Sequence, residues 1–349
     1  MRISVEQLTG WCVEALTHAG VGQRDAETTA DVLVTTDSWG VFTHGVKSLR
    51  GYIRRVRGGG IRKDGRPRVE REGLAWAMVD GDSSLGMVTS TFAMEVAIAK
   101  AKQAGIGYAG VRNSCHFGGA GYYALMAAKE GMIGVAMCND IPTVTVPGAR
   151  GAVMGSNPFA FAAPRVGEPA IFLDMATSTV AGGKVFAAAK VGRTIPNHWI
   201  VDADGLPTSD PTIFPDTAAL TPMAGHKGYG IALLIETLSG VLTGAMIGPH
   251  VLSWMFQDAS RPTGHGAAFI AINVGAMMPT EVFEQRMAQT VKEIREAPKA
   301  KGSERIWLPG EMEWERRAKA LRDGIELPDD VVANLKGLAE DLGLNWRWT

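Results

Sequence analysis

The stretch that decides the fold reads GIGYAGVRNSCHFGGAGYYALMAAKEG, residues 105–131. Residues 105–111 are typical of a strand, and the alanine-rich residues 122–131 are typical of a helix. Between them, His116 is followed by Gly118, Gly119 and Gly121, whose backbone can curl close to a ligand. A strand, a glycine loop and a helix in this order can present free backbone N–H groups and the helix dipole to an anion. A tight turn with a structural histidine is the simpler interpretation of the loop taken alone.

The glycine loop is not a Rossmann fingerprint. It lacks the GxGxxG spacing, and no acidic residue follows about 20 positions later at a second strand end. A phosphate-binding loop of another kind stays open as an interpretation.

The composition indicates a globular chain. Its 349 residues are 46% apolar and 20% charged, with a net charge of −1. About two domains are expected at this length. The charge balance gives no basic surface for nucleic acid, so we expect small-molecule partners and no nucleic acid.

Cysteine usage and hydropathy indicate the compartment. Cys12, Cys115 and Cys138 lie far apart and show neither CxxC nor zinc-ligand spacing. The first residues carry no apolar run of signal-peptide length. The segment Ile231–Gly248 contains a glutamate and three glycines, which predicts a buried core helix and no membrane span. We expect a cytoplasmic protein.

Hydrophobic periodicity predicts helices at both ends and strands in the middle. Helices are expected in the first 36 residues, over 47–60 with its arginines (50, 54, 55 and 57) as a solvated face, over 91–105 as a strongly amphipathic helix, after 225–230, and around Glu281–Ala297, Glu311–Arg322 and Asp329–Leu342. Strands are expected within 74–88, 132–140, 155–164, 170–178 and 267–277. This mix favours an α/β fold of α+β type.

Five further motifs have a functional and a structural interpretation. In DSWGVFTHGV, residues 37–46, Thr43 can orient the His44 imidazole for proton transfer, although loop histidines are often surface decoration. GSNP (155–158) is a polar ligand contact or a plain turn, and DMATS (174–178) binds a ribose or caps a helix. HKGYG (226–230) puts a lysine at a helix N-terminus, and LPGE (308–311) binds a ribose or caps a helix.

Hydrolase and metalloenzyme interpretations fail on the motifs they need. There is no GxSxG elbow. Cys115 directly precedes His116, and adjacent side chains diverge, which makes a poor nucleophile and base pair. No HExxH motif or carboxylate cluster indicates a metal.

The ordered series THG, NSCHFGGAGYYA, GSNPFAFAAP, DMATSTVAGGK, HKGYG and LPGE resembles the type 2 malate/L-lactate dehydrogenase family over about residues 3–340. This family includes ureidoglycolate and sulfolactate dehydrogenases and diketogulonate and piperideine-carboxylate reductases. The resemblance implies a non-Rossmann NAD(P)-binding domain with a largely antiparallel sheet, over 76–284, and a helical domain from both chain ends, 1–75 with 285–349. It also implies homodimers with the active site near the subunit interface, NAD or NADP as cofactor, and no metal.

Site residues follow from the resemblance position by position. His44, His116 and Thr43 are the implied catalytic residues, with a histidine as proton donor or acceptor. The implied cofactor-binding residues are His116, Gly118, Gly119, Ala120, Asp140, Asp174, Met175, Ala176, Lys184, Lys227, Gly228, Pro309, Gly310 and Glu311. The implied substrate contacts are Ser48, Ser156 and Trp39.

Two positions depart from the family pattern. Trp39-Gly40 stands where Arg-Gly is frequent, and we expect Trp39 to offer the substrate a packing face. Ser48 stands where the family usually has the arginine that grips the substrate carboxylate. Lys47 and Arg50 flank it but point elsewhere on a helix.

The sequence therefore predicts an NAD(P)-dependent oxidoreductase acting on a 2-oxo or 2-hydroxy acid-like substrate. A cyclic imine or keto-sugar acid reductase and a catalytically silent cofactor-binding protein are the alternatives. The substrate, the choice between NAD and NADP, and the direction of the reaction stay open.

Overall fold

The computed structural model describes residues 1–348 and is organised around a seven-stranded sheet. Its strands, in spatial order, are β2 (Arg68–Glu72), β3 (Trp76–Asp80), β4 (Ile106–Ser114), β13 (His265–Asn273), β5 (Met132–Cys138), β8 (Phe159–Ala163) and β9 (Ile171–Met175). All neighbours in this sheet are antiparallel except β3 and β4, as expected for a largely antiparallel sheet.

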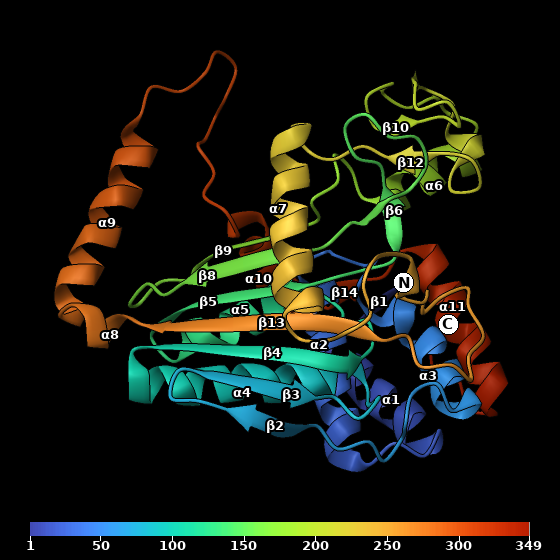
Figure 1. Ribbon diagram of the computed structural model, residues 1–349, viewed down its shortest axis with the longest axis horizontal. Coiled ribbons are helices and arrows are strands. Elements are labelled where there is room, and N and C mark those ends of the chain that lie inside the picture. Colours follow the sequence, from blue (N-terminus) through green and yellow to red (C-terminus); the bar gives the residue numbers. More distant parts are fainter. Residues whose placement is uncertain (349) are drawn as a thin grey trace.

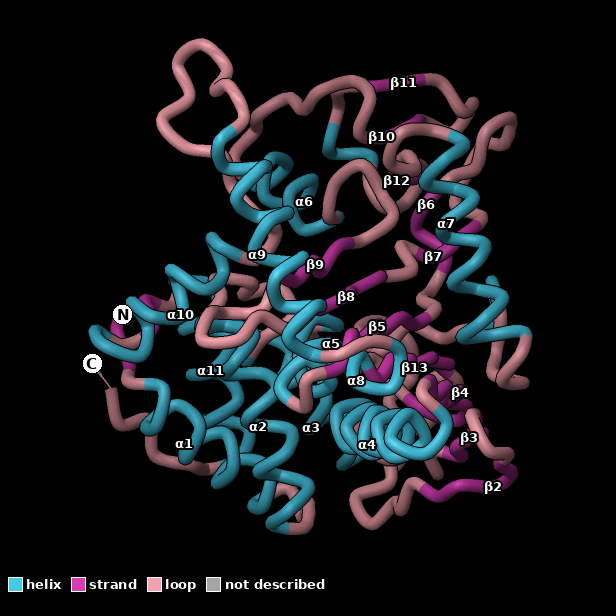
Figure 2. Tube along the Cα trace, turned by 90° about the vertical axis from the view of Figure 1, so that its left-hand side faces the viewer, coloured by secondary structure: helices cyan, strands magenta, loops and turns pink. Residues whose placement is uncertain are grey.

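Two helices cover one face of this sheet, α4 (Gly86–Ala104) and α5 (Ala120–Lys129). They lie very close to the strands because glycines face them. A Cβ on Gly107 would lie 2.0 Å from the Ala97 carbonyl oxygen of α4, and one on Gly134 would lie 2.2 Å from the Ala124 carbonyl oxygen of α5. Figure 2 shows α4 and α5 between the strands and a further helical layer.

Both chain ends build that helical layer. It contains α1 (Val5–His18), α2 (Gln23–Ser38), α3 (Leu49–Gly58), α10 (Glu311–Asp323) and α11 (Asp329–Leu342). Strand β1 (Arg2–Ile3) pairs with β14 (Ile325–Glu326), which places the two termini side by side (Figure 1). The hydrophobic core runs without a break from this layer into the sheet. The expected boundary at 75/76 falls between β2 and β3, which pair with each other; the two-domain division stays a prediction.

A second, smaller sheet was not predicted from the sequence. It has the order β11 (Pro207–Thr208), β10 (Ile200–Val201), β12 (Ala219–Leu220), β6 (Pro142–Val144) and β7 (Met154–Gly155). Together with α6 (Gly182–Lys190) it encloses its own core around Val144, Val185 and Leu220. Strands of two or three residues are too short to show an alternating pattern, which explains why the sequence did not reveal them.

The apolar segment at 231–248 is corrected by the structure. Helix α7 (His226–Glu236) continues as a π-helical turn, Thr237–Val241, against the sheet face opposite α4 and α5 (Figure 1). It is not a buried core helix, because much of its apolar surface faces outward. The exposed side chains are Leu233, Leu234, Val241, Leu242, Met246 and Ile247. No helix within residues 1–348 is long and apolar enough to cross a membrane.

Two other helix expectations are corrected. Helix α4 is not strongly amphipathic, because it is packed between the sheet and α2. The arginines of α3 are not all solvated, since Arg55 is completely buried. Near the other end of the chain, α8 (Val274–Met277) leads into α9 (Thr280–Glu296), which extends away from the sheet (Figure 1). Val291 is the one buried residue of α9.

Candidate functional site

The loop that carries His44 is shaped by a buried acid that sequence reasoning missed. The Asp37 carboxylate accepts a hydrogen bond from the Val46 N–H at 2.9 Å. Gly45 passes so close to it that an added Cβ would lie 1.8 Å from Asp37 Oδ1. Burial raises the pKa of Asp37 well above its usual value. At the exposed end of the loop, Thr43 Oγ1 lies 2.8 Å from His44 Nδ1, so the hydroxyl orients the ring as expected.

His116 stands where β4 ends and the glycine loop begins, with its ring centroid 5.5 Å from that of His44. It is 9% exposed. Tyr52 of α3 contacts its Nδ1 at 2.5 Å, and Trp254 stacks on the ring with a centroid separation of 4.6 Å. Burial and the nearby His44 lower the pKa of His116 to about 3, so the ring is neutral at pH 7.

Arg55 holds the loop that supplies Trp254. Its guanidinium donates to four backbone carbonyls, those of Trp254 and Arg261 at 2.8 Å, Ser253 at 2.7 Å and Gln257 at 3.3 Å. Helix α3 therefore supports His116 twice, directly through Tyr52 and indirectly through Arg55 and Trp254. Trp254 gave no signal in the sequence. The spacing of Leu49, Tyr52, Ile53 and Val56 would have placed Tyr52 on the buried face of α3.

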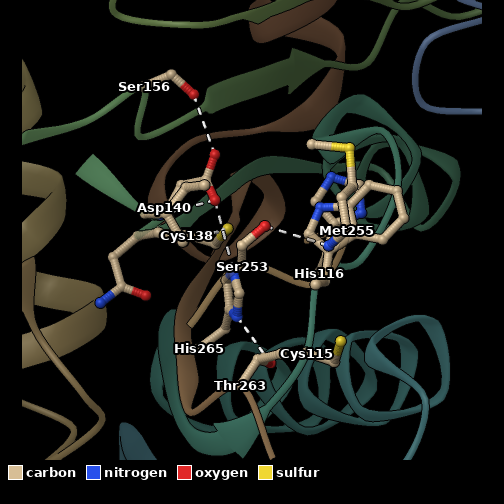
Figure 3. Close-up of polar contacts among 12 residues, drawn as sticks. Cys115, His116, Cys138, Asp140, Ser156, Ser253, Met255, Thr263 and His265 are labelled. Atoms are coloured by element: carbon tan, nitrogen blue, oxygen red, sulfur yellow. Dashed lines mark hydrogen bonds and ion pairs between the residues drawn. The ribbon is translucent and has the colours of Figure 1, made fainter. Parts of the chain in front are cut away.

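A chain of polar side chains runs beside His116 (Figure 3). The Ser156 hydroxyl donates to Asp140 at 3.2 Å, and the other carboxylate oxygen lies 3.5 Å from His265 Nε2. Thr263 Oγ1 donates to the Ser114 carbonyl at 3.2 Å and lies 2.9 Å from His265 Nδ1. Burial acts to raise the pKa of Asp140, but the interaction with His265 and the hydrogen bond from the Ile141 N–H hold that pKa below its usual value. Asp140 is thus a carboxylate, and its side chain stays 23% exposed.

The glycine loop meets an acid of the chain itself. The Gly121 N–H, in the first turn of α5, donates to Asp174 at 2.7 Å. A Cβ on Gly119 or Gly121 would lie 3.5 or 3.2 Å from that carboxylate, and Gly118 has φ +78°. The Asp174 carboxylate therefore already takes the place at this helix N-terminus where the sequence allowed for an external anion. Asp174 also lies within electrostatic range of His44.

Backbone contacts join the separate motifs into one region. Thr177 donates through N and Oγ1 to the Ser156 carbonyl at 2.9 Å, and the Met223 N–H donates to the Thr177 carbonyl at 2.9 Å, just before α7. A Cβ on Gly183, next to Lys184, would lie 3.3 Å from Thr43. The GSNP, DMATS, HKGYG and THG motifs are therefore neighbours in space.

Two lysines are available in this region. Lys184 and Lys227 are exposed in the first turns of α6 and α7, and neither forms an ion pair within residues 1–348. The N-terminus of α7 has no side-chain cap. Gly228 is required by packing, because a Cβ there would lie 2.1 Å from the Met223 carbonyl oxygen. Within the described residues, no group of three or more His, Cys, Asp or Glu side chains is placed to hold a metal.

The late loop lies beside the first residues of β9, at Phe172. The Phe172 N–H donates to the Pro309 carbonyl at 3.3 Å, and Gly310, with φ +89°, passes so close that a Cβ would lie 2.5 Å from the Phe172 ring. Glu311 accepts from the Leu308 N–H at 2.8 Å and pairs with Arg305 at 3.2 Å and with Arg295. Its carboxylate thus closes the 308–311 turn and does not cap α10, whose N-terminus has no side-chain cap.

The expected substrate contact at Trp39 is corrected. Trp39 is 2% exposed and packs on Phe172 with a centroid distance of 5.2 Å, because it closes the end of α2 against β9. No face is left for a substrate. Ser48 is 5% exposed, and its hydroxyl donates to the Thr43 carbonyl at 3.4 Å.

Comparisons with known proteins find relatives over nearly the whole chain. A sequence model of the malate/L-lactate dehydrogenase family matches residues 3–336. A malate dehydrogenase of Pyrococcus abyssi is 38% identical over 99% of this chain and 96% of its own length. A ureidoglycolate dehydrogenase (NAD(+)) of Escherichia coli K12 is 36% identical over 96% of this chain and 95% of its own. The solved structure of sulfolactate dehydrogenase from Methanocaldococcus jannaschii superimposes with a TM-score of 0.91 at 36% identity, covering 99% of this chain and 98% of that one.

Proposed function

Because this chain belongs to the malate/L-lactate dehydrogenase family, we propose that it transfers a hydride between NAD or NADP and the carbonyl or hydroxyl carbon of a 2-oxo or 2-hydroxy acid-like substrate. Membership of the family makes the chain a dehydrogenase or reductase acting on CH–OH or C=N groups. The observation that supports the reaction best is the pair of imidazoles, His44 and His116, with ring centroids 5.5 Å apart. Asp174 acts electrostatically on His44, and Asp140 acts on His116.

The residues around these imidazoles fit a dinucleotide. Lys227, in the uncapped first turn of α7, and Lys184, in the first turn of α6, offer unpaired positive charge to phosphates. Residues 174–176 at the end of β9, and residues 309–311 beside its start at Phe172, would offer backbone groups to a ribose and base. When bound, the nicotinamide supplies the hydride chemistry. Measurements with NADH and with NADPH decide which of the two cofactors the protein uses.

The protein supplies the proton through a histidine. Reduction adds a hydride to the carbonyl carbon and a proton to its oxygen, and oxidation removes both. His44 is our candidate for the proton carrier, because it is half-buried at the mouth of the site and Thr43 orients its ring. A histidine in this role contributes about 10² to 10⁴-fold in rate.

The α3 arginines all form contacts within the protein, including Arg57 with the Asp341 carbonyl at 3.0 Å, although exposed Arg54 keeps free donors. Arg50 pairs with Asp341, Arg54 donates to the Met255 carbonyl, and Arg55 is used by the loop around Trp254. With Ser48 in place of the family arginine, we expect small 2-oxo acids to bind weakly. A cyclic imine or keto-sugar acid is therefore the alternative substrate class.

A substrate panel tests the proposal. Excess protein is mixed with NADH or NADPH and a series of 2-oxo acids, cyclic imines and keto-sugar acids, and the loss of reduced cofactor is followed. We expect oxidation with at least one class and a loss of about 10² to 10⁴-fold in His44→Ala. Cofactor binding without any turnover would instead favour the catalytically silent alternative.

We also infer a homodimer that buries the outward face of α7 and its π-helical turn. Six large apolar side chains between residues 233 and 247 are 42–58% exposed there. A continuous apolar face of this kind on a soluble enzyme marks an interface, and the resemblance implies a second copy of the chain as its occupant. A cytoplasmic location stays a prediction.

A further inference from the structure

We propose that Tyr52 fixes His116 as the neutral tautomer that carries its proton on Nε2, so that His116 donates a hydrogen bond to the substrate oxygen while His44 carries the proton. The inference rests on the proposed function for the substrate oxygen only. The tautomer itself follows from contacts within the protein. Tyr52 is accordingly a positioning residue, and His116 is the residue that meets the substrate.

The contact between Tyr52 and His116 has a direction. The Tyr52 hydroxyl is completely buried and lies 2.5 Å from His116 Nδ1. A phenol O–H is a stronger acid than a neutral imidazole N–H, so the short bond runs from the phenol to a lone pair on Nδ1. The neighbouring Ser48 hydroxyl is already turned to the Thr43 carbonyl. A buried hydroxyl that kept its proton unshared would lose about 1–3 kcal/mol.

The His116 ring is also held in its plane. Trp254 stacks on it with an interplanar angle of 20°, and Tyr52 stacks on Trp254 with a centroid distance of 5.0 Å. Arg55 fixes the backbone of Trp254 from below. A 180° ring flip would keep the stack but put Cδ2 in place of Nδ1 beside the Tyr52 hydroxyl, which would lose its acceptor, so the orientation with Nε2 away from Tyr52 is retained.

The remaining ring nitrogen is free for a ligand. Among the residues described, no group hydrogen-bonds His116 Nε2, and this atom is not sealed from the surface. The titratable groups that act on the ring are His44, Asp140 and His265 from three other segments, besides Tyr52 of α3. Burial outweighs the pull of Asp140 and lowers the pKa of His116, so the ring faces the site as a neutral N–H donor.

This arrangement divides the work of the two histidines. As the hydride reaches the carbonyl carbon, the C=O π electrons move to the oxygen, and the Nε2–H of His116 stabilises the growing negative charge. The proton that completes the alcohol comes from His44, and His116 keeps its own. One preorganised donor at a developing oxyanion is typically worth about 10²–10³-fold in turnover.

The tautomer can be read without any substrate. Histidine labelled with ¹⁵N distinguishes protonated from unprotonated ring nitrogens by NMR, and His116→Asn identifies the signals of residue 116. We expect a proton on Nε2 and none on Nδ1 at neutral pH in the unmodified protein, and a mixture of tautomers in Tyr52→Phe. A proton on Nδ1, or an unchanged tautomer in Tyr52→Phe, would overturn the assignment.

Turnover measurements test the part of the proposal in which His116 donates a hydrogen bond to the substrate oxygen. Tyr52→Phe should lower kcat by about ten- to a hundredfold, as expected when a donor is partly lost to the wrong tautomer, while the dissociation constant of the cofactor stays unchanged. Tyr108→Phe is the matched control. It also removes a tyrosine hydroxyl that donates a hydrogen bond, but the acceptor there is the Leu238 carbonyl at 2.7 Å, away from His116. Equal kcat in Tyr52→Phe and the control would refute the role of Tyr52. If no substrate of the panel reacts, the proposed function fails, and the NMR result still decides the tautomer.

Discussion

Arg55 provides the sharpest test of how the site is supported. Its neighbour Arg54 looks identical in the sequence, yet Arg54 is exposed and contacts only the Met255 carbonyl, whereas Arg55 is 0% exposed and donates to four carbonyls. The change to make is Arg55→Lys, which keeps the positive charge and most of the apolar stem. Arg54→Lys is the control on the same helix.

The magnitude follows from the geometry. Three of the four bonds of Arg55 are 2.7–2.8 Å long and point in the planar directions that a guanidinium offers. An ammonium group is a point donor on a shorter reach and can satisfy one of these carbonyls well. Losing two hydrogen bonds to a charged group, at about 1.5–3 kcal/mol each, gives a loss of roughly 3–6 kcal/mol, which overlaps the range of about 3–5 kcal/mol seen when a buried charged pair is broken. Arg54→Lys should stay within about 0.5 kcal/mol.

Urea unfolding at one fixed protein concentration measures both variants. Turnover gives a second readout, because the released loop would no longer hold Trp254 against His116, so kcat should fall in Arg55→Lys and not in Arg54→Lys. Equal free energies of unfolding in the two variants would refute the reasoning. So would a destabilised Arg55→Lys protein with unchanged kcat, since Trp254 would then not support His116.

Four further outcomes are expected. Lys227→Ala should weaken cofactor binding with little change in the pH profile, and an unaltered dissociation constant in a cofactor fluorescence titration would reject the phosphate role. Ser48→Arg should improve kcat/KM for pyruvate and oxaloacetate by about ten- to a hundredfold; efficient use of these acids by the unmodified protein, with no gain in the variant, would contradict the altered-substrate interpretation. Because the pKa of His116 falls from its usual 6.5 to about 3 on folding, the unfolded chain binds the extra proton. The free energy of unfolding is therefore highest above about pH 6.5 and decreases as pH falls toward about 3, by up to about 1.4 kcal/mol per pH unit. His116→Asn should flatten that slope between pH 6.5 and 5 in unfolding experiments, and an identical slope would exclude a buried neutral ring. Leu234→Asp, on the outward face of α7, should give monomers in light scattering, and an unchanged dimer would place the interface elsewhere.

Local patterns predicted the large elements well. The strand at 106–114, the glycine loop and the helix at 120–129 were expected from their own residues, and the expected closing helices agree with α9, α10 and α11 to within a few positions. Periodicity also predicted helices at both chain ends, where the structure has α1, α2, α10 and α11.

What the sequence could not supply were pairings between distant residues. The hydrogen bond from Gly121, in the first turn of α5, to Asp174 joins residues 53 positions apart. The stacking of Trp254 on His116 depends on the hydrogen bond from buried Arg55 to the Trp254 carbonyl. Hydropathy alone could not show that α7 faces outward, because an interface and a core have the same composition. The prediction that Trp39 contacts the substrate was wrong because an aromatic residue beside a functional loop can also pack into the core, as Trp39 does.

The pairing of β1 with β14 has a consequence for how the protein is made. Arg2 leaves the ribosome 324 residues before its strand partner Glu326, and Ile3 likewise leaves long before Ile325. Helix α1 likewise completes its packing only against α11. During synthesis the N-terminal helices therefore expose apolar surface until β14 and α11 have been made. This exposed surface favours chaperone binding and aggregation. A chain released before residue 325 cannot close this layer, so premature termination late in the message should yield a degraded product and no truncated enzyme.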